Sequence, residues 1–216
     1  ERSRGLGDVY KRQIAFWTSL IMLPWTLKPL WSPLLEMYRT KKFFVVLTQM
    51  VSGVTFGLIA LSLHLPSFFA VTIALFAIVA FSGATHDVAC DGVYMDELNA
   101  QEQAKYIGWQ GAFYNVAKII GTGLLVYLAG FLKDEYEGPA EDAVLYSWTV
   151  IMIILGVVMF ALGIYHTRML PSGKHAHSVT SFSQSMTELW NVIRNFFTKK
   201  HIAVSYTHLT LPTKLE

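Results

Sequence analysis

Residues 67–91 read SFFAVTIALFAIVAFSGATHDVACD, and this stretch decides the fold class. Its first eighteen residues, Ser67 to Ala84, carry no charge. As a helix with a rise of about 1.5 Å per residue, such a run crosses most of the hydrocarbon core of a bilayer, which is about 30 Å thick. The same helix then continues into His86, Asp87 and Asp91. We therefore predict a membrane-spanning helix with charged side chains where water is scarce.

The composition of the whole chain supports a membrane protein. Of 216 residues, 53% are hydrophobic and 15% are charged, and the mean hydropathy is +0.41. Soluble domains carry about 25% charged residues. The formal net charge of +2, with no strongly basic run, predicts no nucleic-acid partner. Cys90 is the single cysteine, which excludes an intrachain disulfide, and we expect neither a metal site nor a cofactor.

Five apolar segments are each long enough to span a bilayer as a helix. They cover residues 14–35, 43–63, 67–94, 106–132 and 143–165. The apolar residues run continuously rather than alternating, which favours helices over the strands of a membrane barrel. The sequence therefore predicts an all-α, polytopic membrane helix bundle with five spanning helices.

The charges between these segments predict the orientation. Lys and Arg follow the first and fifth segments, whereas acidic residues dominate the connection at 133–142. Because Lys and Arg favour the cytoplasmic side, we expect the connections after the first, third and fifth segments to be cytoplasmic. The connection at 133–142 is then expected on the opposite side.

The two ends of the chain are set aside. Residues 1–13 and 204–216 resemble translated sequencing-adapter read-through, and we expect both to be non-native tails. Residues 170–203 are expected to form a cytoplasmic linker with an amphipathic helix at 185–197, whose start has the capping-box pattern of a serine followed by a glutamate. The alternative is that this helix begins a further membrane hairpin.

Asp87 and Asp91 are the first candidates for a functional site. They are four residues apart, so they share one helix face. Two like charges repel in a low dielectric, and we expect one of them to be able to hold a proton near physiological pH. Tyr94 offers a hydroxyl on the same face, whereas His86 lies about 100° around the helix and need not join them. The alternative is that these groups lie at the cytoplasmic helix end and are merely solvated or bound to helix amides.

Two lysines lie within the predicted spans. Lys118 is in the middle of the fourth segment, where it either pairs with Asp87 or Asp91 or lines a wet cavity and binds an anionic substrate. Lys28, in the first segment, either pairs with an acidic group or reaches the cytoplasmic interface. Small residues also recur in the fourth segment and predict close helix packing there. These are Gly108, Gly111, Ala117, Gly121 and Gly123.

Three stretches resemble the AmpG-type muropeptide permeases, which are members of the major facilitator superfamily. Residues 27–38, LKPLWSPLLEMY, with Lys41 and Lys42 after them, resemble the second helix and following loop of that family. Residues 84–92, ATHDVACDG, are similar to its fourth-helix pattern of two aspartates. Residues 113–123 resemble its glycine-rich fifth helix.

The resemblance implies a partial N-terminal half of a twelve-helix transporter, with helices two to six present. It carries functional roles over to Asp87, Asp91 and Lys28. Three positions depart from the family pattern and put muropeptide specificity in question: His86 replaces a glutamine, Asn115 stands where an arginine is common, and Lys118 is an added charge.

These observations predict a bacterial inner-membrane, multi-pass, proton-coupled transporter that imports muropeptides or a related small anionic solute. We expect lipid, protons and the solute as partners, a monomer at full length, and no enzymatic activity. An acyl-CoA or nucleotide-like solute is an alternative cargo, and a non-transporting membrane receptor is an alternative function. An aspartate-dyad enzyme is disfavoured because both carboxylates lie on one helix.

Overall fold

The computed structural model describes residues 2–140, 142–172, 187, 190, 191, 194, 195 and 198. Every element within these residues is helical, which confirms the all-α class. In chain order they are α1 (Arg2–Tyr38), α2 (Lys41–Ser62), α3 (Phe68–Glu97), α4 (Ala100–Ile119), the π-helix η1 (Ile120–Leu124), α5 (Leu125–Asp134) and α6 (Ala143–Met169).

Among the described residues, four helical stretches are long and apolar enough to cross a membrane. They are α2, α3, the continuous stretch Ala100–Asp134 and α6. The fifth predicted span, residues 14–35, lies within α1, which is not among these four. Lys28, three prolines and three tryptophans lower its mean hydropathy, although α1 covers all of the expected span at 14–35 without interruption.

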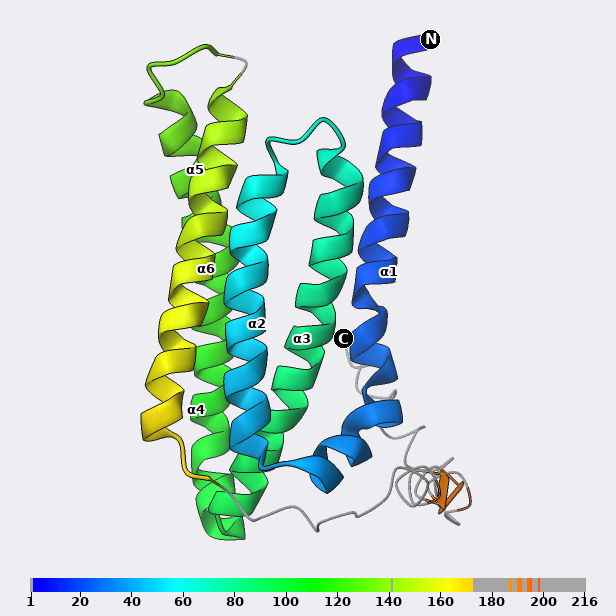
Figure 1. Cartoon of the computed structure of the whole chain (residues 1–216), viewed down its shortest axis with the longest axis vertical. Helices are drawn as coiled ribbons and strands as arrows, with labels where there is room; N and C mark the ends of the chain where they lie inside the picture. The colour runs from blue at the N-terminus through cyan, green and yellow to red at the C-terminus, as the bar shows by residue number, and fades with distance from the viewer. Residues whose placement is uncertain are drawn as a thin grey trace, which may run out of the picture.

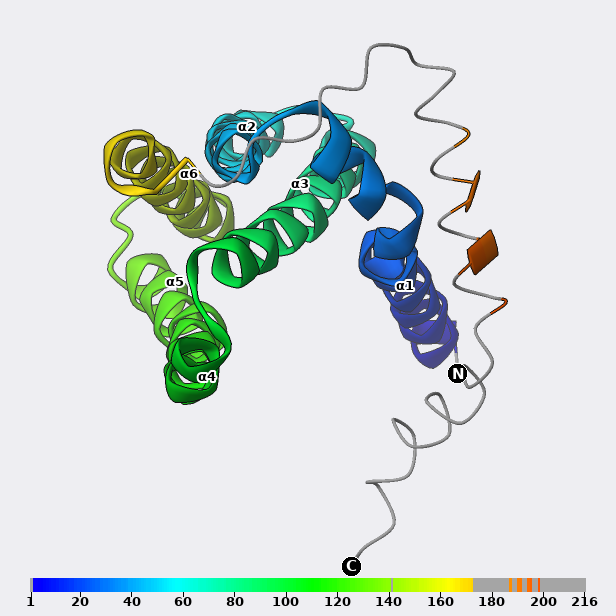
Figure 2. The same ribbon diagram turned by 90° about the horizontal axis from the view of Figure 1, so that it is seen from below.

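The helices form an arc whose two ends are α1 and the α4–α5 stretch (Figure 2). Within the arc, α2 packs against both α3 and α6, α1 packs against α3, and α5 packs against α6. Figure 1 shows that the last turns of α1 bend away from the axis of its longer part and run toward the start of α2. Pro29 and Pro33 lie in these turns and explain the bend, since proline removes a helical hydrogen bond and clashes with the preceding turn.

Small residues and hydroxyl groups make up much of the buried seam around α2. Ser52, Ser82 and Ser147 are among the most buried side chains. The backbones of α2 and α6 approach closely where a Cβ on Gly53 would lie 3.0 Å from the carbonyl oxygen of Gly156. Small residues allow this close approach, which is the usual way that helices associate in membranes.

The glycines of α4 and η1 do not pack as the sequence predicted. A Cβ at any of the four would meet no heavy atom of another part of the described chain within 4 Å. The physical reason is that α4 contributes no buried residue in the structure. The four are Gly108, Gly111, Gly121 and Gly123.

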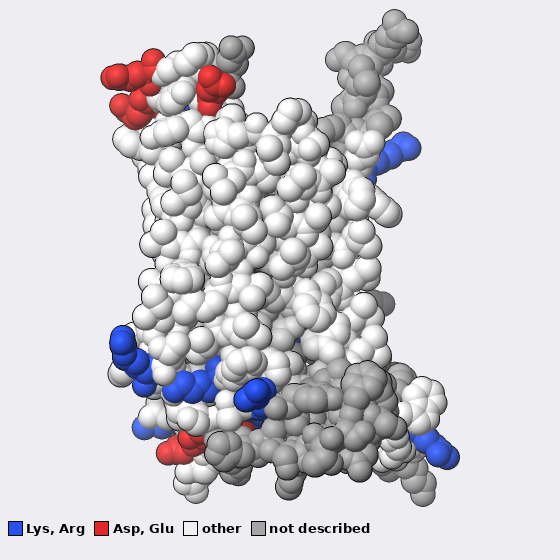
Figure 3. Space-filling model, viewed as in Figure 1, with Lys and Arg blue, Asp and Glu red and all other residues white. Residues whose placement is uncertain are grey.

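Charged side chains gather at the two ends of the bundle and leave an uncharged band between them (Figure 3). Acidic residues lie at the end that carries the α5–α6 connection, which we call the acidic end. Most of the visible lysines and arginines lie at the opposite end, which we call the basic end. This end holds the α1–α2 connection, the α3–α4 connection and the last turn of α6 (Figure 1).

The predictions for the two ends of the chain compare differently with the structure. α1 begins at Arg2, so the helix passes through the stretch expected as an N-terminal tail. The amphipathic helix expected at 185–197 lies largely outside the described residues, and the tail expected at 204–216 lies entirely outside them.

Candidate functional site

The contact between the first turn of α2 and the end of α3 shows how deep Asp87 and Asp91 lie along the bundle. Thr40 caps α2 by accepting a hydrogen bond from the backbone N–H of Phe43. The ammonium of Lys41 then lies 2.9 Å from the carboxylate of Asp96, near the end of α3. Asp91 and Asp87 are five and nine residues earlier on α3, which places them about 8 and 14 Å further into the bundle. They therefore lie at a level within the length of the bundle, beyond the outermost charges of the basic end, and both are exposed.

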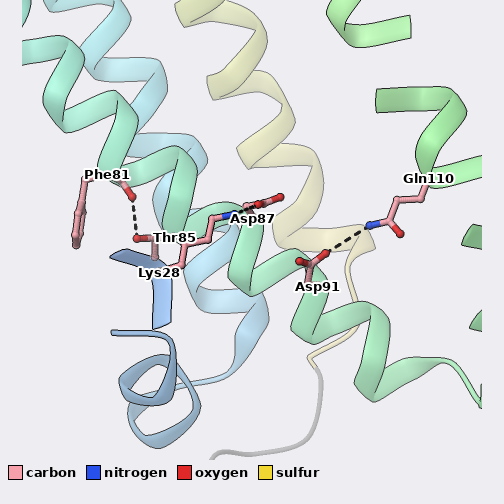
Figure 4. A network of polar contacts seen from close by, with 6 residues as sticks. All are labelled: Lys28, Phe81, Thr85, Asp87, Asp91 and Gln110. Carbon is pink, nitrogen blue, oxygen red and sulfur yellow. Dashed lines mark hydrogen bonds and ion pairs between the residues drawn. The ribbon is translucent and has the colours of Figure 1, made fainter. Parts of the chain in front are cut away.

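Lys28 and Asp87 form an ion pair between α1 and α3 (Figure 4). The Lys28 side chain is 22% exposed and that of Asp87 is 52% exposed, so the carboxylate keeps access to solvent or to a bound solute. Of the two alternatives for Lys28, the structure has the one in which it pairs with an acidic group. Both residues precede the basic end on their helices, so the pair lies in an otherwise apolar region.

Asp91 points toward α4, whereas Asp87 points toward α1. The Gln110 side-chain amide on α4 donates a hydrogen bond of 3.5 Å to its carboxylate, and Figure 4 shows the two side chains pointing toward each other. In the described part of the chain, Asp91 makes no ion pair. The two aspartates therefore share a helix but address different partners, one on α1 and the other on α4.

Tyr94 has a structural partner instead of joining the aspartates. Its hydroxyl donates a hydrogen bond of 2.6 Å to the backbone carbonyl of Gln103. Asn99 begins α4 with a capping box that includes Glu102. These contacts tie the end of α3 to the start of α4 and help to fix Gln110 near Asp91.

His86 belongs to the seam with α2. One ring nitrogen lies 3.0 Å from the Thr48 hydroxyl, and the other lies 3.4 Å from the Cys90 thiol. One residue further along α2, Gln49 lies 2.8 Å from a ring nitrogen of His166 on α6. Sequence reasoning missed this polar seam. Its signal was the recurrence of polar residues at helical spacing along the otherwise apolar α2.

Lys118 and Asn115 lie on the exposed surface of α4. Lys118 pairs with neither Asp87 nor Asp91, and no ion pair of its side chain occurs among the described residues. The Asn115 side chain bonds within its own helix, to the carbonyl oxygen of Gly111, at 2.9 Å. The π-helix η1 starts two residues after Lys118, and single π-helical turns often mark functional sites.

A separate apolar groove opens between α1, α2 and α3, with a volume of about 610 Å³. Trp31 forms part of its wall, and its ring lies 4.8 Å from that of Phe81. The indole N–H of Trp31 is buried and has no hydrogen-bond partner among the described residues. No charged residue lines the groove, so it is distinct from the paired charges.

The arrangement suits the handling of ions and polar solutes. It brings a carboxylate and an ammonium together across two helices, and it holds a second carboxylate one turn away. No cluster of side chains in the described residues could hold a metal ion. The chemistry available is the exchange of protons and of charged partners.

Comparison with known proteins gives the relationships of the chain. A family model described as Major Facilitator Superfamily matches residues 8–211. A protein of Haemophilus influenzae, described as uncharacterized, is 28% identical over 145 residues. The match covers 64% of this chain and 32% of that protein, so the chain spans about a third of the length of this relative. No solved structure matches the chain.

Proposed function

Because the chain belongs to the Major Facilitator Superfamily, we propose that it is part of a proton-coupled secondary transporter of the bacterial inner membrane. Its cargo is a muropeptide or a related small anionic solute, which it imports. The observation that carries the proposal is the Lys28–Asp87 ion pair between α1 and α3. A charged group costs about 2.5–3.5 kcal/mol at the centre of a membrane helix, and such groups usually mark solute or proton pathways.

The ion pair offers a simple coupling reaction. A proton that binds the Asp87 carboxylate converts it into a neutral carboxylic acid, and Lys28 loses its counter-ion. An anionic group of the solute then takes that place and accepts hydrogen bonds from the ammonium. When the solute leaves, Asp87 releases its proton and the ion pair forms again. The charge of the site is the same at the beginning and at the end of the cycle.

The distribution of charge predicts how the proposed transporter is oriented in the membrane. The basic end is cytoplasmic by the preference of Lys and Arg for that side. For import, Asp87 then takes up its proton from the opposite side and releases it toward the cytoplasm. Alternating access comes from rocking of the two halves of the complete transporter around a midplane site.

The muropeptide assignment rests on the resemblance of residues 84–92 to the AmpG-type pattern. His86 departs from that pattern, but its ring contacts Thr48 and Cys90 rather than the ion pair. Asn115 departs from it as well, and its side chain bonds within α4. Neither substitution removes a group that contacts Asp87 or Lys28 in the described structure, which favours a related cargo.

Uptake of labelled anhydro-muropeptide tests the proposal. The complete gene that contains this chain is expressed in cells that lack their own permease. We expect uptake that a protonophore abolishes, and a loss of at least about tenfold, equivalent to about 1.4 kcal/mol, for Asp87→Asn and for Lys28→Gln. Lys133→Gln and Asp134→Asn are matched controls, because these side chains are 4.0 Å apart and more than half exposed at the acidic end.

The charge-swap variant K28D/D87K separates coupling from stability. It restores an ion pair and is expected to restore folding, but it removes the ammonium from α1 and should not restore uptake. Full uptake by the swap would show that the pair is only structural. No uptake by a well-expressed wild type would refute the muropeptide cargo, and uptake of an acyl-CoA or nucleotide instead would assign the alternative.

A further inference from the structure

Two charged side chains in the spanning parts of α3 and α4 remain without an oppositely charged partner in the described part of the chain. They are Asp91 on α3 and Lys118 on α4. Lys28 already neutralises Asp87. A charge within a membrane bundle is costly when it is unpaired, so a bound molecule that pairs with both groups gains from each contact.

The hydrogen bond between Asp91 and Gln110 fixes the relative level of the two helices. α3 and α4 are consecutive and run in opposite directions (Figure 1). Lys118 is eight residues after Gln110, which places it about 12 Å nearer the acidic end than Asp91 is. Asp87 lies between them, about 6 Å from the level of Asp91. The order along the bundle axis is therefore a carboxylate, a neutral ion pair and an ammonium.

The position of Lys118 around α4 is compatible with a shared binding region. Gln110, Tyr114 and Lys118 follow each other at intervals of four residues, so each lies about 40° around the helix from the one before. Lys118 thus lies about 80° from the side chain that contacts Asp91. Tyr114, between them, is exposed and adds a hydroxyl group to this side of α4.

We infer that the solute is dipolar: a cationic group, such as a protonated amine, binds Asp91, and a carboxylate about 12 Å further along the bundle axis binds Lys118. This inference rests on the proposed function and narrows its substrate class. A solute with only negative groups would meet Lys118 favourably but would be repelled by Asp91. The site therefore selects amino-carboxylate and peptide-like solutes over nucleotides and acyl-CoA. In this division of roles, protonation of Asp87 frees Lys28 for one anionic group of the solute, whereas Asp91 and Lys118 select for an amine and for a further carboxylate.

A set of blocked peptides tests the selection. The probe is a labelled muropeptide stem peptide with one free amine, a free C-terminal carboxylate and a second carboxylate. The competitors are its N-acetylated and C-amidated forms, both of which keep the second carboxylate. Equilibrium binding to the purified complete transporter is measured beside uptake. For the wild type, we expect each blocked form to bind at least tenfold more weakly than the free peptide.

The variants assign each end of the solute to one residue. Asp91→Asn should abolish the preference for a free amine and leave the preference for a free carboxylate. Lys118→Gln should do the reverse. Lys133→Gln and Asp134→Asn, at the acidic end, should change neither preference. Asp91→Glu and Lys118→Arg keep the charges and should keep both preferences. They provide a second test at the same positions if a neutral variant fails to fold.

The outcomes separate this inference from the proposed function. Equal binding of free and acetylated peptides to the wild type, or an intact amine preference in Asp91→Asn, would overturn the inference. If a wild type without amine preference still showed proton-dependent uptake, the dipolar site would be refuted and the proposed transport function would be kept. Selective binding without any uptake would support the dipolar site and refute transport.

Discussion

Replacing Gly53 with alanine tests the contact that holds α2 against α6. The new Cβ would lie 3.0 Å from the Gly156 carbonyl oxygen and 3.0 Å from the backbone nitrogen of Phe160. Both are backbone atoms of α6, so no side-chain rotation relieves the clash, and the two helices must separate by a few tenths of an ångström. Overpacking of this kind costs about 1–3 kcal/mol.

Gly57 provides the matched control, one turn further along the same helix. An alanine there would meet no atom within 4 Å. Both substitutions gain about 0.8–1.0 kcal/mol of helix propensity, so this contribution cancels in the comparison. The difference in unfolding free energy between Gly53→Ala and Gly57→Ala should therefore be about 1–3 kcal/mol.

Thermal unfolding of the purified protein in detergent, followed by tryptophan fluorescence, measures this difference. In a chain of this size, 1 kcal/mol shifts the melting temperature by about 2–4 °C. Gly156→Ala should resemble Gly53→Ala, and the double variant should cost less than the sum of the two because both disturb one contact. Equal melting of Gly53→Ala and Gly57→Ala would refute the close approach of the two helices.

Three further substitutions have expected outcomes in the same assay. Trp31→Phe removes an N–H that is buried without a partner among the described residues. We expect the free energy of unfolding to stay unchanged or to rise by about 1 kcal/mol. A fall of more than about 2 kcal/mol would show that the N–H has an acceptor. Gly92→Ala places a Cβ 2.6 Å from the flexible Cδ of Lys41, which should move and cost less than about 1 kcal/mol; a loss as large as that of Gly53→Ala would contradict this. Thr48→Val removes the hydroxyl that lies 3.0 Å from the ring of His86, and should cost about 0.5–1.5 kcal/mol; unchanged stability would count against the polar seam.

The helices were the most predictable part of the protein. Runs such as 43–63 and 143–165 contain no charge, and in a bilayer only a helix or a closed barrel satisfies the backbone of such a run. α2 and α6 cover these runs, with ends that differ by a few residues. α1 was harder, because length and periodicity indicate a helix there while its prolines and Lys28 reduce its apolarity.

The partners of the charged groups were not predictable from spacing. The sequence left Lys28 with two alternatives and offered Lys118 as a partner for Asp87. Which lysine reaches the carboxylate depends on the rotation of α3 and on the bend in α1, and both are set by packing between helices. The glycines show the same limit, since Gly53 packs closely whereas Gly121 has open space around it. Small residues permit close contact, but the neighbouring helix decides where it occurs.

Asp87 and Asp91 lie on α3, in the packed group of helices, whereas their partners lie on α1 and α4 at the ends of the arc. α2, α3 and α6 enclose most of the buried seam, so Asp87 and Asp91 lie on a helix that is fixed by its neighbours. Lys28 lies on α1, at one end of the arc, and Gln110 lies on α4, which contributes no buried residue. A movement of α4 relative to α3 breaks few apolar contacts but changes which groups face Asp91, whereas a movement of α1 must also separate Trp31 from Phe81. In the proposed transport cycle, the charges could therefore exchange partners while the α2–α3–α6 core stays packed.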